Sequence, residues 1–261
     1  MNGTAPTGNG QKPHITVHDL TMAYGSFVLM RDMNFTINHG DVFIIMGGSG
    51  SGKSTLLRHL IGLNEPAHGE ILYEDESFTR ADAARRQQIL RRVGVTFQSG
   101  ALWSAMTLAE NIGLLLEEYT DLSPTEIREV ASLKLALVGL KGFEDYYPSQ
   151  ISGGMQKRAG LARAIALDPA ILFFDEPSAG LDPITSRLLD ELILDLRDSL
   201  GTTVVVVTHE LASIFTIGNN SIYLDVDTRT ITSRGPPKEL LARSKDPKLR
   251  QFLTRGGREN P

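Results

Sequence analysis

The chain contains no cysteine, which excludes disulfide bonds and thiolate metal sites and suits a cytoplasmic protein. It also lacks any apolar run close to the ~20 residues that a membrane-spanning helix needs. Basic residues do not predominate: 26 lysines and arginines stand against 31 aspartates and glutamates, a net charge of −5 that argues against generic nucleic-acid binding. Residues 1–10 carry neither a basic start nor an apolar segment, so we expect no signal peptide and a disordered tail over residues 1–14.

Short apolar runs and helical patterns alternate along the rest of the chain. With 41% hydrophobic residues over 261 positions, the sequence suits one large α/β domain with a full core. Several runs are apolar throughout, as in strands covered on both faces, and strands alternating with helices predict a mostly parallel sheet. The expected strands are residues 15–20, 35–37, 42–46, 70–73, 93–96, 171–174, 204–208 and 221–224.

The distribution of strand signals also predicts the domain organisation. These signals vanish after Gln98, so we expect an inserted helical subdomain at about residues 100–165. After the turn Gly235-Pro236-Pro237 the chain becomes polar and helical. We therefore expect an α/β domain over residues 15–235 and a short C-terminal helical extension over residues 236–261.

Two helix starts are recognisable from their capping residues. Ser123-Pro124-Thr125-Glu126 is a capping box with proline at the first helical position. Asp182-Pro183 begins another helix in the same way. Leu188, Leu192 and Leu196 lie four apart in that second helix, which predicts that they share its buried face.

The segment from Gly47 to Ser54 reads Gly-Gly-Ser-Gly-Ser-Gly-Lys-Ser and fits the phosphate-binding pattern G-x-x-x-x-G-K-[ST] at every required position. An apolar strand precedes it and a helix follows it, as this loop requires; the alternative is an ordinary glycine-rich turn. Glycines leave backbone N–H groups free to point at phosphates, Lys53 would contact the β- and γ-phosphates, and the Ser54 hydroxyl would ligate Mg²⁺. We therefore expect ATP or GTP binding. The residues expected to contact nucleotide here are Gly47, Gly48, Ser49, Gly50, Ser51, Gly52, Lys53, Ser54 and Thr55.

An apolar strand that ends in two acidic residues supplies further candidates. It runs from Ile171 to Asp175 and Glu176, and we expect it to lie beside the strand that leads into the phosphate loop. Asp175 would then hold Mg²⁺ through water, and Glu176 would act as the general base that polarises a water toward the γ-phosphate. The alternative is an acidic turn after a buried strand.

A second buried strand delivers a histidine at its carboxyl end. Val204 to Val207 are four consecutive valines, followed by Thr208 and His209. Ligands of open α/β sheets bind at this edge, so His209 is placed to donate a hydrogen bond to the γ-phosphate and to help hold the attacking water. A purely structural histidine is the alternative.

The segment Ser152-Gly153-Gly154 opens a helix and forms a second candidate anion site. A serine hydroxyl, bare backbone amides and a helix N-terminus all favour a phosphate. Because the phosphate loop already holds one side of the nucleotide, this second site is most economically explained if it binds the nucleotide held by another copy of the chain. We therefore predict a homodimer with ATP between the subunits; the alternative is an ordinary glycine-rich helix entry.

Taken together, these motifs resemble the ATPase subunit of an ATP-binding cassette (ABC) transporter, over about residues 15–233. The resemblance implies a P-loop NTPase (RecA-like) α/β core. It also implies that Gln98 senses Mg²⁺ and couples to the membrane partner, that Asp182 in Ser178-Ala179-Gly180-Leu181-Asp182 lies at the dimer interface, and that Tyr24 stacks on adenine. On this basis the expected catalytic residues are Glu176, His209 and Gln98; the expected metal-holding residues are Ser54, Gln98 and Asp175; and Ser152, Gly153, Gly154, Asp182 and Tyr24 join the expected ATP-binding residues.

One departure and three short segments refine the resemblance. The family's signature usually continues with glutamine, whereas here Met155 takes that position; Ser152 and Gly154 make the phosphate contacts, so we expect hydrolysis to survive. Residues 97–102 and 151–155 look like the bacterial branch that serves the Mla and related MCE phospholipid transport systems. The tail 246–253 is similar to the ending of those subunits, which packs on the neighbouring ATPase.

The resemblance implies a peripheral protein at the cytoplasmic face of a bacterial inner membrane. Two ATPase subunits would sit under an inner-membrane permease, with a STAS-domain protein and an MCE-domain lipid-binding protein, and would move phospholipid between inner and outer membranes. The alternatives are the ATPase of an ABC importer for amino acids or another small solute, and a soluble ABC ATPase in DNA repair or translation. A P-loop kinase is a further alternative, but it would leave Ser152-Gly153-Gly154 unexplained.

Overall fold

The computed structural model describes residues 12–98 and 100–255. Most of the tail predicted to be disordered, Ser99 and the end of the predicted C-terminal extension therefore lie outside the described residues. Pro13 and His14, expected to belong to that tail, instead begin the first strand.

A six-stranded sheet forms the centre of the molecule. Neighbouring strands in it run parallel, except that the edge strand β10 is antiparallel to β9. This confirms the expected mostly parallel sheet. In spatial order its strands are β10 (Thr230–Arg234), β9 (Asn220–Asp225), β3 (Val42–Gly47), β8 (Thr203–Val207), β7 (Ile171–Asp175) and β6 (Val93–Thr96).

A second, antiparallel sheet covers one face of the first, and the sequence patterns did not predict it as a separate layer. It is built on two long strands that pair along most of their length, where we expected only short fragments. In spatial order its strands are β2 (Phe27–Asn38), β1 (Pro13–Tyr24), β4 (His68–Tyr73) and β5 (Glu76–Ser77).

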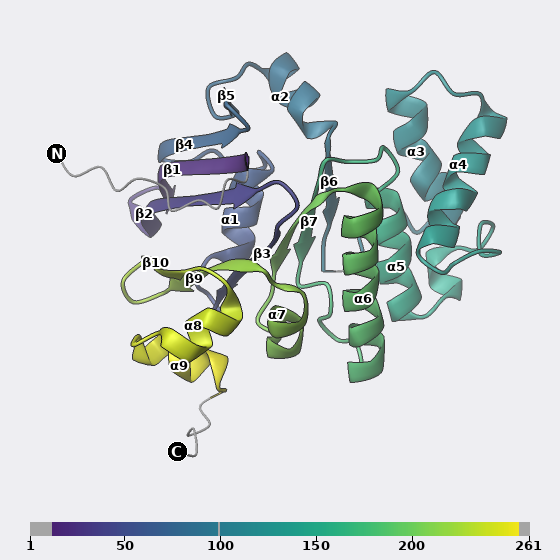
Figure 1. Cartoon of the computed structure of the whole chain (residues 1–261). Coiled ribbons are helices and arrows are strands. Elements are labelled where there is room, and N and C mark those ends of the chain that lie inside the picture. The colour runs from purple at the N-terminus through teal and green to yellow at the C-terminus, as the bar shows by residue number, and fades with distance from the viewer. Residues whose placement is uncertain (1–11, 99, 256–261) are drawn as a thin grey trace.

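Most helices pack on the face of the parallel sheet that the antiparallel sheet leaves open (Figure 1). α3 and α4 stand together at one end of the molecule, in the segment predicted to be a helical subdomain, while α8 and α9 lie at the opposite end beside β9 and β10. Within the described residues, no helix is long and apolar enough to span a membrane. The helices are α1 (Lys53–Leu60), α2 (Ala83–Leu90), α3 (Leu108–Tyr119), α4 (Pro124–Leu137), α5 (Gly153–Ala164), α6 (Pro183–Leu200), α7 (Leu211–Ile217), α8 (Pro237–Arg243) and α9 (Pro247–Leu253), with a 3₁₀ turn at Pro148–Gln150.

The hydrophobic core has two parts, one on each face of the parallel sheet. Val42, Ile44 and Met46 of β3 face the helical side, and Phe43 and Ile45 face the antiparallel sheet. Because successive side chains of a strand point to opposite faces, burial of both faces requires an apolar residue at every position. This explains the uninterrupted apolar run before the phosphate loop.

The buried face of α6 differs from the prediction. Leu196 is buried as expected, but the other buried leucine and isoleucine are Leu189 and Ile193, and Leu192 is only partly buried. Leu188 is 59% exposed, so its expected burial was wrong. Positions 189, 193 and 196 also share one face of a helix, so a second apolar stripe overlaps the predicted stripe at positions 188, 192 and 196.

The predicted caps are confirmed. Ser123 Oγ accepts a hydrogen bond from the Glu126 N–H, and the Glu126 carboxylate accepts one from the Ser123 N–H, which is the reciprocal pattern of a capping box. Asp182 caps α6 by accepting hydrogen bonds from the N–H groups of Ile184 and Thr185.

The C-terminal helix α9 packs on its own chain. Leu249 and Leu253 are buried in the helical-side core, and the Phe252 ring lies 5.4 Å from the Tyr223 ring of β9. Lys248 adds ion pairs to Asp225 and a neighbouring aspartate. The apolar side of α9 is thus covered within the chain, and the packing of residues 246–253 on a neighbouring subunit stays a prediction.

Candidate functional site

The phosphate loop joins β3 to α1, and its glycines are required by its shape. Gly50 and Gly52 have φ values of +77° and +84°, in the left-handed region that favours glycine. At Gly47 a Cβ atom would lie 2.6 Å from Ser51 Oγ and 2.7 Å from the Leu224 carbonyl oxygen, which is too close for any side chain. The loop therefore keeps its backbone exposed at the N-terminus of α1, where N–H groups and the helix dipole favour an anion.

Lys53, the first residue of α1, reaches back over this loop. Its side chain is mostly buried, and its Nζ donates hydrogen bonds to the carbonyl oxygens of Gly47 and Gly48, each at 3.1 Å. Burial lowers the pKa of Lys53, an effect that the nearby Glu176 and Asp175 oppose. Among the described residues Lys53 forms no ion pair, so its charge is available to a ligand in the loop.

Asp175 lies next to Ser54, although the strand order differs from the prediction. β8 lies between β3 and β7, so the acidic strand is not adjacent to the strand of the phosphate loop. The carboxyl ends of all three parallel strands still meet at one edge, and the Ser54 hydroxyl donates a 2.8 Å hydrogen bond to the Asp175 carboxylate. Burial raises the pKa of Asp175. A hydroxyl and a carboxylate in contact are the oxygen donors that Mg²⁺ prefers.

Glu176 follows in a constrained backbone conformation. Its φ is +49°, rare for a residue other than glycine, and its N–H donates to the Val207 carbonyl oxygen at 2.8 Å. One carboxylate oxygen, Oε1, lies 2.8 Å from His209 Nδ1. The other, Oε2, is buried and has no hydrogen-bond partner in the part of the chain that the structure describes. An unsatisfied buried carboxylate oxygen in a strained backbone is typical of a functional site.

A groove of about 1340 Å³ brings most of the predicted ATP-site residues together. Ser51 is the exception within the phosphate loop: it is buried and does not line the groove. The predicted residues that do line it are Tyr24, Gly47, Gly48, Ser49, Gly50, Gly52, Lys53, Ser54, Thr55, Gln98, Glu176 and His209.

The segment Ser152-Gly153-Gly154 lies apart from that groove. It lines a separate hollow of about 350 Å³, which also contains Met155, Asp182 and Leu188. The Ser152 hydroxyl caps α5 by accepting a 3.3 Å hydrogen bond from the Met155 N–H. The structure thus places Ser152 and Asp182 together but does not bring them to the phosphate loop of the same chain.

Sequence reasoning missed two residues that support these sites from within α5. Lys157 Nζ donates to the carbonyl oxygens of Pro177 and Ala179 at 2.7 and 2.5 Å, which ties α5 to the segment that follows Glu176. Gln156 donates to the Pro148 carbonyl oxygen at 2.9 Å and so holds the turn before α5. Both contacts are to backbone oxygens distant in sequence, which no spacing pattern can indicate.

Sequence reasoning also missed the contribution of the C-terminal extension to the groove. Arg255 pairs with Glu210, the residue after His209, at 3.0 Å. The polar composition of this segment gave no signal of that position. The residues of the extension that line the groove are Lys248, Gln251, Phe252 and Arg255.

Comparison with known sequences gives consistent matches. The family profile described as ABC transporter matches residues 30–179. The chain is 41% identical over 239 residues to the probable ribonucleotide transport ATP-binding protein mkl of Mycobacterium tuberculosis strain H37Rv, covering 92% of this chain but only 66% of that protein's length. It is 38% identical to the intermembrane phospholipid transport system ATP-binding protein MlaF of Escherichia coli K12, covering 92% of this chain and 88% of that protein.

Two solved structures share the architecture. A dimeric post-hydrolysis state of the ATP-binding cassette MJ0796 bound to ADP and Pi superposes with a TM-score of 0.77 at 31% identity, covering 85% of this chain and 98% of that one. The cbiO1 component of a Clostridium perfringens ABC transporter complex superposes with a TM-score of 0.81 at 25% identity, covering 94% and 95%. These neighbours confirm the predicted fold class, an α/β P-loop NTPase core.

Proposed function

This chain belongs to the ABC transporter family, and we propose that it is the ATP-hydrolysing motor subunit of a complex that moves phospholipid between the inner and outer membranes of a bacterium. The membership confirms the predicted family and enzyme class, an ATPase coupled to transport. The assignment of phospholipid as the transported substrate is supported by 38% identity to the E. coli phospholipid transport ATPase over 92% of this chain. The inner-membrane location and the permease, STAS-domain and MCE-domain partners are part of the same proposal.

The main support for the ATPase mechanism is that two side-chain contacts lie together at one edge of the parallel sheet. Ser54 contacts Asp175, and Glu176 contacts His209. The phosphate loop and Lys53 would bind the β- and γ-phosphates, and Tyr24, which is 55% exposed in the groove, would stack on the adenine. Ser54, Asp175 and Gln98 would hold Mg²⁺, which would neutralise the charge that develops on the phosphates.

Glu176 is the residue that we assign as the general base. His209 fixes Oε1, whereas Oε2 is unpartnered among the described residues and is free to take a proton from the attacking water. His209 lines the same groove, and we assign to it the roles of orienting this carboxylate and of donating a hydrogen bond to the γ-phosphate. Lys157 holds the backbone after Glu176 and so limits how far the base can move.

The second half of the ATP site would come from a second copy of the chain. Ser152, Gly153, Gly154 and Asp182 face a hollow of their own, so they are available to a nucleotide bound in the partner's groove. Met155 lines that hollow without replacing Ser152 or Gly154, which supports the expectation that hydrolysis survives this substitution.

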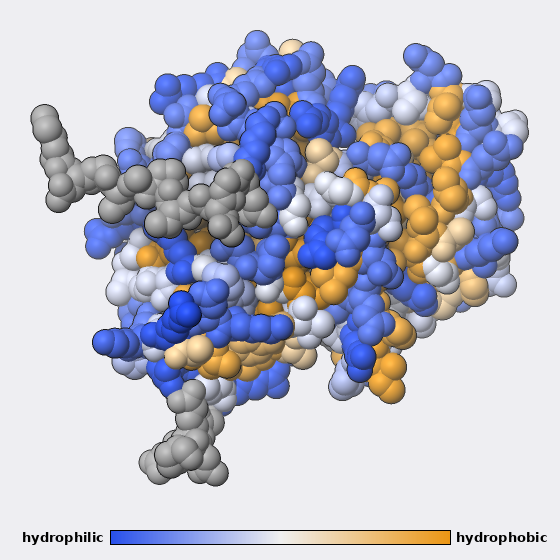
Figure 2. Space-filling view, in the orientation of Figure 1, coloured by the Kyte–Doolittle hydropathy of each residue, from blue (hydrophilic) through white to orange (hydrophobic). Residues whose placement is uncertain are grey.

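The exposed apolar residues of α3 and α4 provide a surface for the permease. Figure 2 shows hydrophobic residues gathered over this end of the molecule. Leu114, Leu133 and Leu137 are exposed there, together with Trp103 just before α3, which is 60% exposed. Such a patch is typical of a protein interface, and it includes the surface between Gly100 and Glu118 where the competing transporters would differ.

The transport proposal is tested by tagging the chain in its native cell, solubilising the membranes in detergent and identifying co-purifying proteins and lipids by mass spectrometry. We expect a permease, a STAS-domain protein, an MCE-domain protein and phospholipid. A Trp103→Glu variant should lose the permease but keep ATP binding, and an exposed charge change away from the patch, Lys238→Glu, serves as its matched control. If the chain co-purifies with a permease and a solute-binding protein, the transported substrate is a small solute and not phospholipid. If it co-purifies only with ribosomes or DNA, the transporter proposal is overturned.

A further inference from the structure

Two histidines and a glutamate, each in or directly after a different strand, meet at one end of the antiparallel sheet. His14 lies in β1, His39 directly follows β2 and Glu74 directly follows β4. The backbone fixes their positions, because the Glu74 N–H donates to the His14 carbonyl oxygen at 2.7 Å and the His39 N–H donates to that of Lys12 at 3.0 Å. One ligand atom from each of the three side chains lies within 4.8 Å of the others.

The side chains are arranged so that ring nitrogens face the carboxylate. The two imidazole rings are stacked, with centroids 4.0 Å apart and planes 9° from parallel. His14 Nδ1 is 2.7 Å from Thr203 Oγ1, which leaves Nε2 as the ring's free nitrogen. His39 Nε2 is buried and lies 3.6 Å from Glu74 Oε1, without a hydrogen-bond partner among the residues that the structure describes. A metal-binding histidine usually has one ring nitrogen on the ion and the other hydrogen-bonded to an oxygen, as Thr203 provides for His14.

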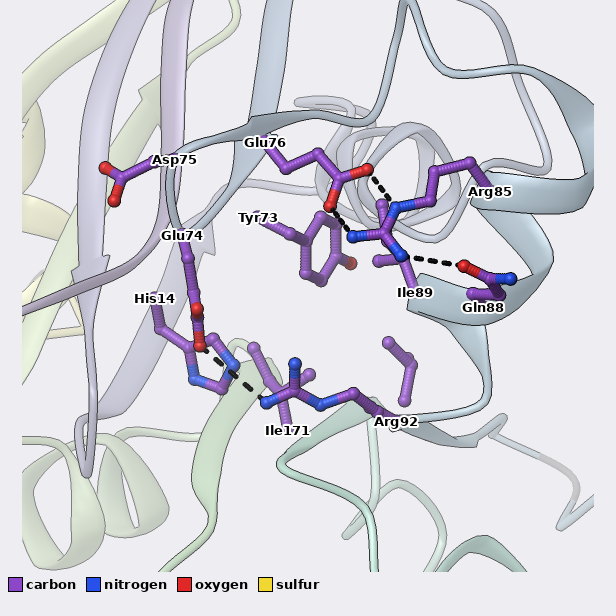
Figure 3. Close-up of a pocket in the computed structure, with 11 residues that line it drawn as sticks. His14, Tyr73, Glu74, Asp75, Glu76, Arg85, Gln88, Ile89, Arg92 and Ile171 are labelled. Atoms are coloured by element: carbon purple, nitrogen blue, oxygen red, sulfur yellow. Dashed lines mark hydrogen bonds and ion pairs between the residues drawn. The ribbon is translucent and has the colours of Figure 1, made fainter.

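An adjoining pocket gives an ion access to this cluster. The pocket has a volume of about 370 Å³ and is lined by His14, Glu74 and Arg92, among others. Figure 3 shows the Glu74 carboxylate beside the His14 ring, with a dashed line to Arg92. Arg92 and Lys12 pair with Glu74 at 3.7 and 3.6 Å, and both are 64% exposed. Ion pairs between such exposed groups are weak, so they oppose a bound divalent ion only weakly.

We propose that His14, His39 and Glu74 form a binding site for a divalent transition-metal ion of the Zn²⁺ class, separate from the nucleotide groove. Two imidazoles and one carboxylate favour Zn²⁺ over Mg²⁺, which prefers oxygen ligands. Tetrahedral Zn²⁺ requires ligand atoms roughly 3.3 Å apart, so the two rings tilt out of their stacked arrangement when the ion binds. Water from the pocket supplies the fourth ligand. The ion joins β1, β2 and β4, and Thr203 links the site to β8 of the parallel sheet.

The test is isothermal titration of the full chain with Zn²⁺, without nucleotide and with excess Mg²⁺ to saturate oxygen-rich sites. We expect one Zn²⁺ per chain, and at least roughly tenfold weaker binding in His39→Gln and in Glu74→Gln, since each removes one ligand. His68→Gln is the matched control, because His68 is exposed and lies at the other end of β4, and it should bind as the parent does. Circular dichroism without metal establishes that each variant is folded.

A second measurement reports the ligand geometry directly. Co²⁺ in place of Zn²⁺ should give the intense visible absorption of a tetrahedral site in the parent and in His68→Gln, and this absorption should be lost in His39→Gln. If the folded His39→Gln and Glu74→Gln chains bind Zn²⁺ as tightly as the parent, or if the parent binds none at micromolar concentration, the site does not exist.

Discussion

At the scale of single residues, the backbone conformation and the contacts of Glu176 both fit its proposed role as general base. Its backbone lies in the left-handed region, its Oε1 is held by His209, and its Oε2 is buried without a partner in the described chain. Such a conformation costs about 1–3 kcal/mol and persists only where the surrounding structure enforces it, as the hydrogen bond from the Glu176 N–H to Val207 does here. The conformation directs the carboxylate into the groove beside Lys53.

Replacing Glu176 with glutamine separates ATP binding from hydrolysis. The amide keeps the size and the contact to His209 but cannot accept the proton, so the hydrolysis rate should fall by about two to four orders of magnitude. ATP affinity should stay near the parental value, because the phosphate loop and Lys53 are unchanged. Phosphate release and equilibrium nucleotide binding measure the two quantities, and a hydrolysis rate within a few fold of the parent would exclude Glu176 as the base.

At the scale of the elements, the sequence was informative wherever the signal is local. The phosphate loop, the caps of α4 and α6 and the apolar strand β3 depend on residues close in the chain, and they were predicted with their roles in the fold. The position of β8 between β3 and β7 was not, because it depends on pairing between strands distant in sequence. The buried face of α6 was misplaced because two stripes of leucine and isoleucine overlap, and only packing against the sheet selects one.

The two stripes of α6 can be distinguished by a pair of matched substitutions. Leu189 is 4% exposed in the core and Leu188 is 59% exposed, one position away on the same helix. Leu189→Ala should lower the free energy of unfolding by about 2–5 kcal/mol, because it leaves a cavity. Leu188→Ala should change it by less than about 0.5 kcal/mol in the isolated chain. Urea denaturation of both variants tests the assignment, which equal losses would contradict.

The same helix contains a buried carboxyl group that makes stability depend on pH. Asp190 is 4% exposed, and burial raises its pKa to about 6. An aspartate in the unfolded chain has a pKa near 3.9, so the contribution of Asp190 to stability is complete below about pH 4 and is lost as the pH rises through about 6. Asp190→Asn should therefore be more stable than the parent at pH 8, by about 1–3 kcal/mol.

This difference in stability should shrink as the pH falls from 8 to 4, and it approaches zero only below about pH 4, where the parent's carboxyl group is protonated in both the folded and the unfolded chain. Asp195→Asn is the control, because Asp195 is exposed on the same helix and should show no such trend. Urea unfolding at both pH values measures the effect. A stability difference between Asp190→Asn and the parent that does not depend on pH would show that the Asp190 carboxyl group has an ordinary pKa.

At the scale of the whole molecule, the residues predicted for ATP hydrolysis fall into two separate places. The groove contains the phosphate loop, Glu176 and His209, whereas Ser152 and Asp182 face another hollow. The order of motifs predicted both sets of residues. Their separation within one chain follows from the position of α5 and α6 relative to the sheet, which the sequence alone did not indicate. It supports the proposal that two copies complete each other's sites.

Mixing two inactive variants tests that proposal. Ser152→Arg places a bulky cation where the partner's nucleotide would bind, and Glu176→Gln removes the base, so each homodimer should be inactive. In a mixed dimer, one site combines an intact Glu176 with an intact Ser152, and the other site carries both changes. Hydrolysis should therefore reappear on mixing and approach half of the parental rate per mixed dimer when the sites act independently.

The matched control places the same two changes in one chain and mixes it with the parent. Each mixed dimer then has one site without the base and one site blocked by the Ser152→Arg substitution, so mixed dimers should contribute no activity beyond that of the remaining parental dimers. If mixing the two single variants restores no activity while the double variant mixed with the parent keeps one active site per mixed dimer, Ser152 acts within its own chain and not across the interface. If the Ser152→Arg chain alone hydrolyses ATP at the parental rate, each chain completes its own site, and the hollow beside Asp182 has no part in hydrolysis.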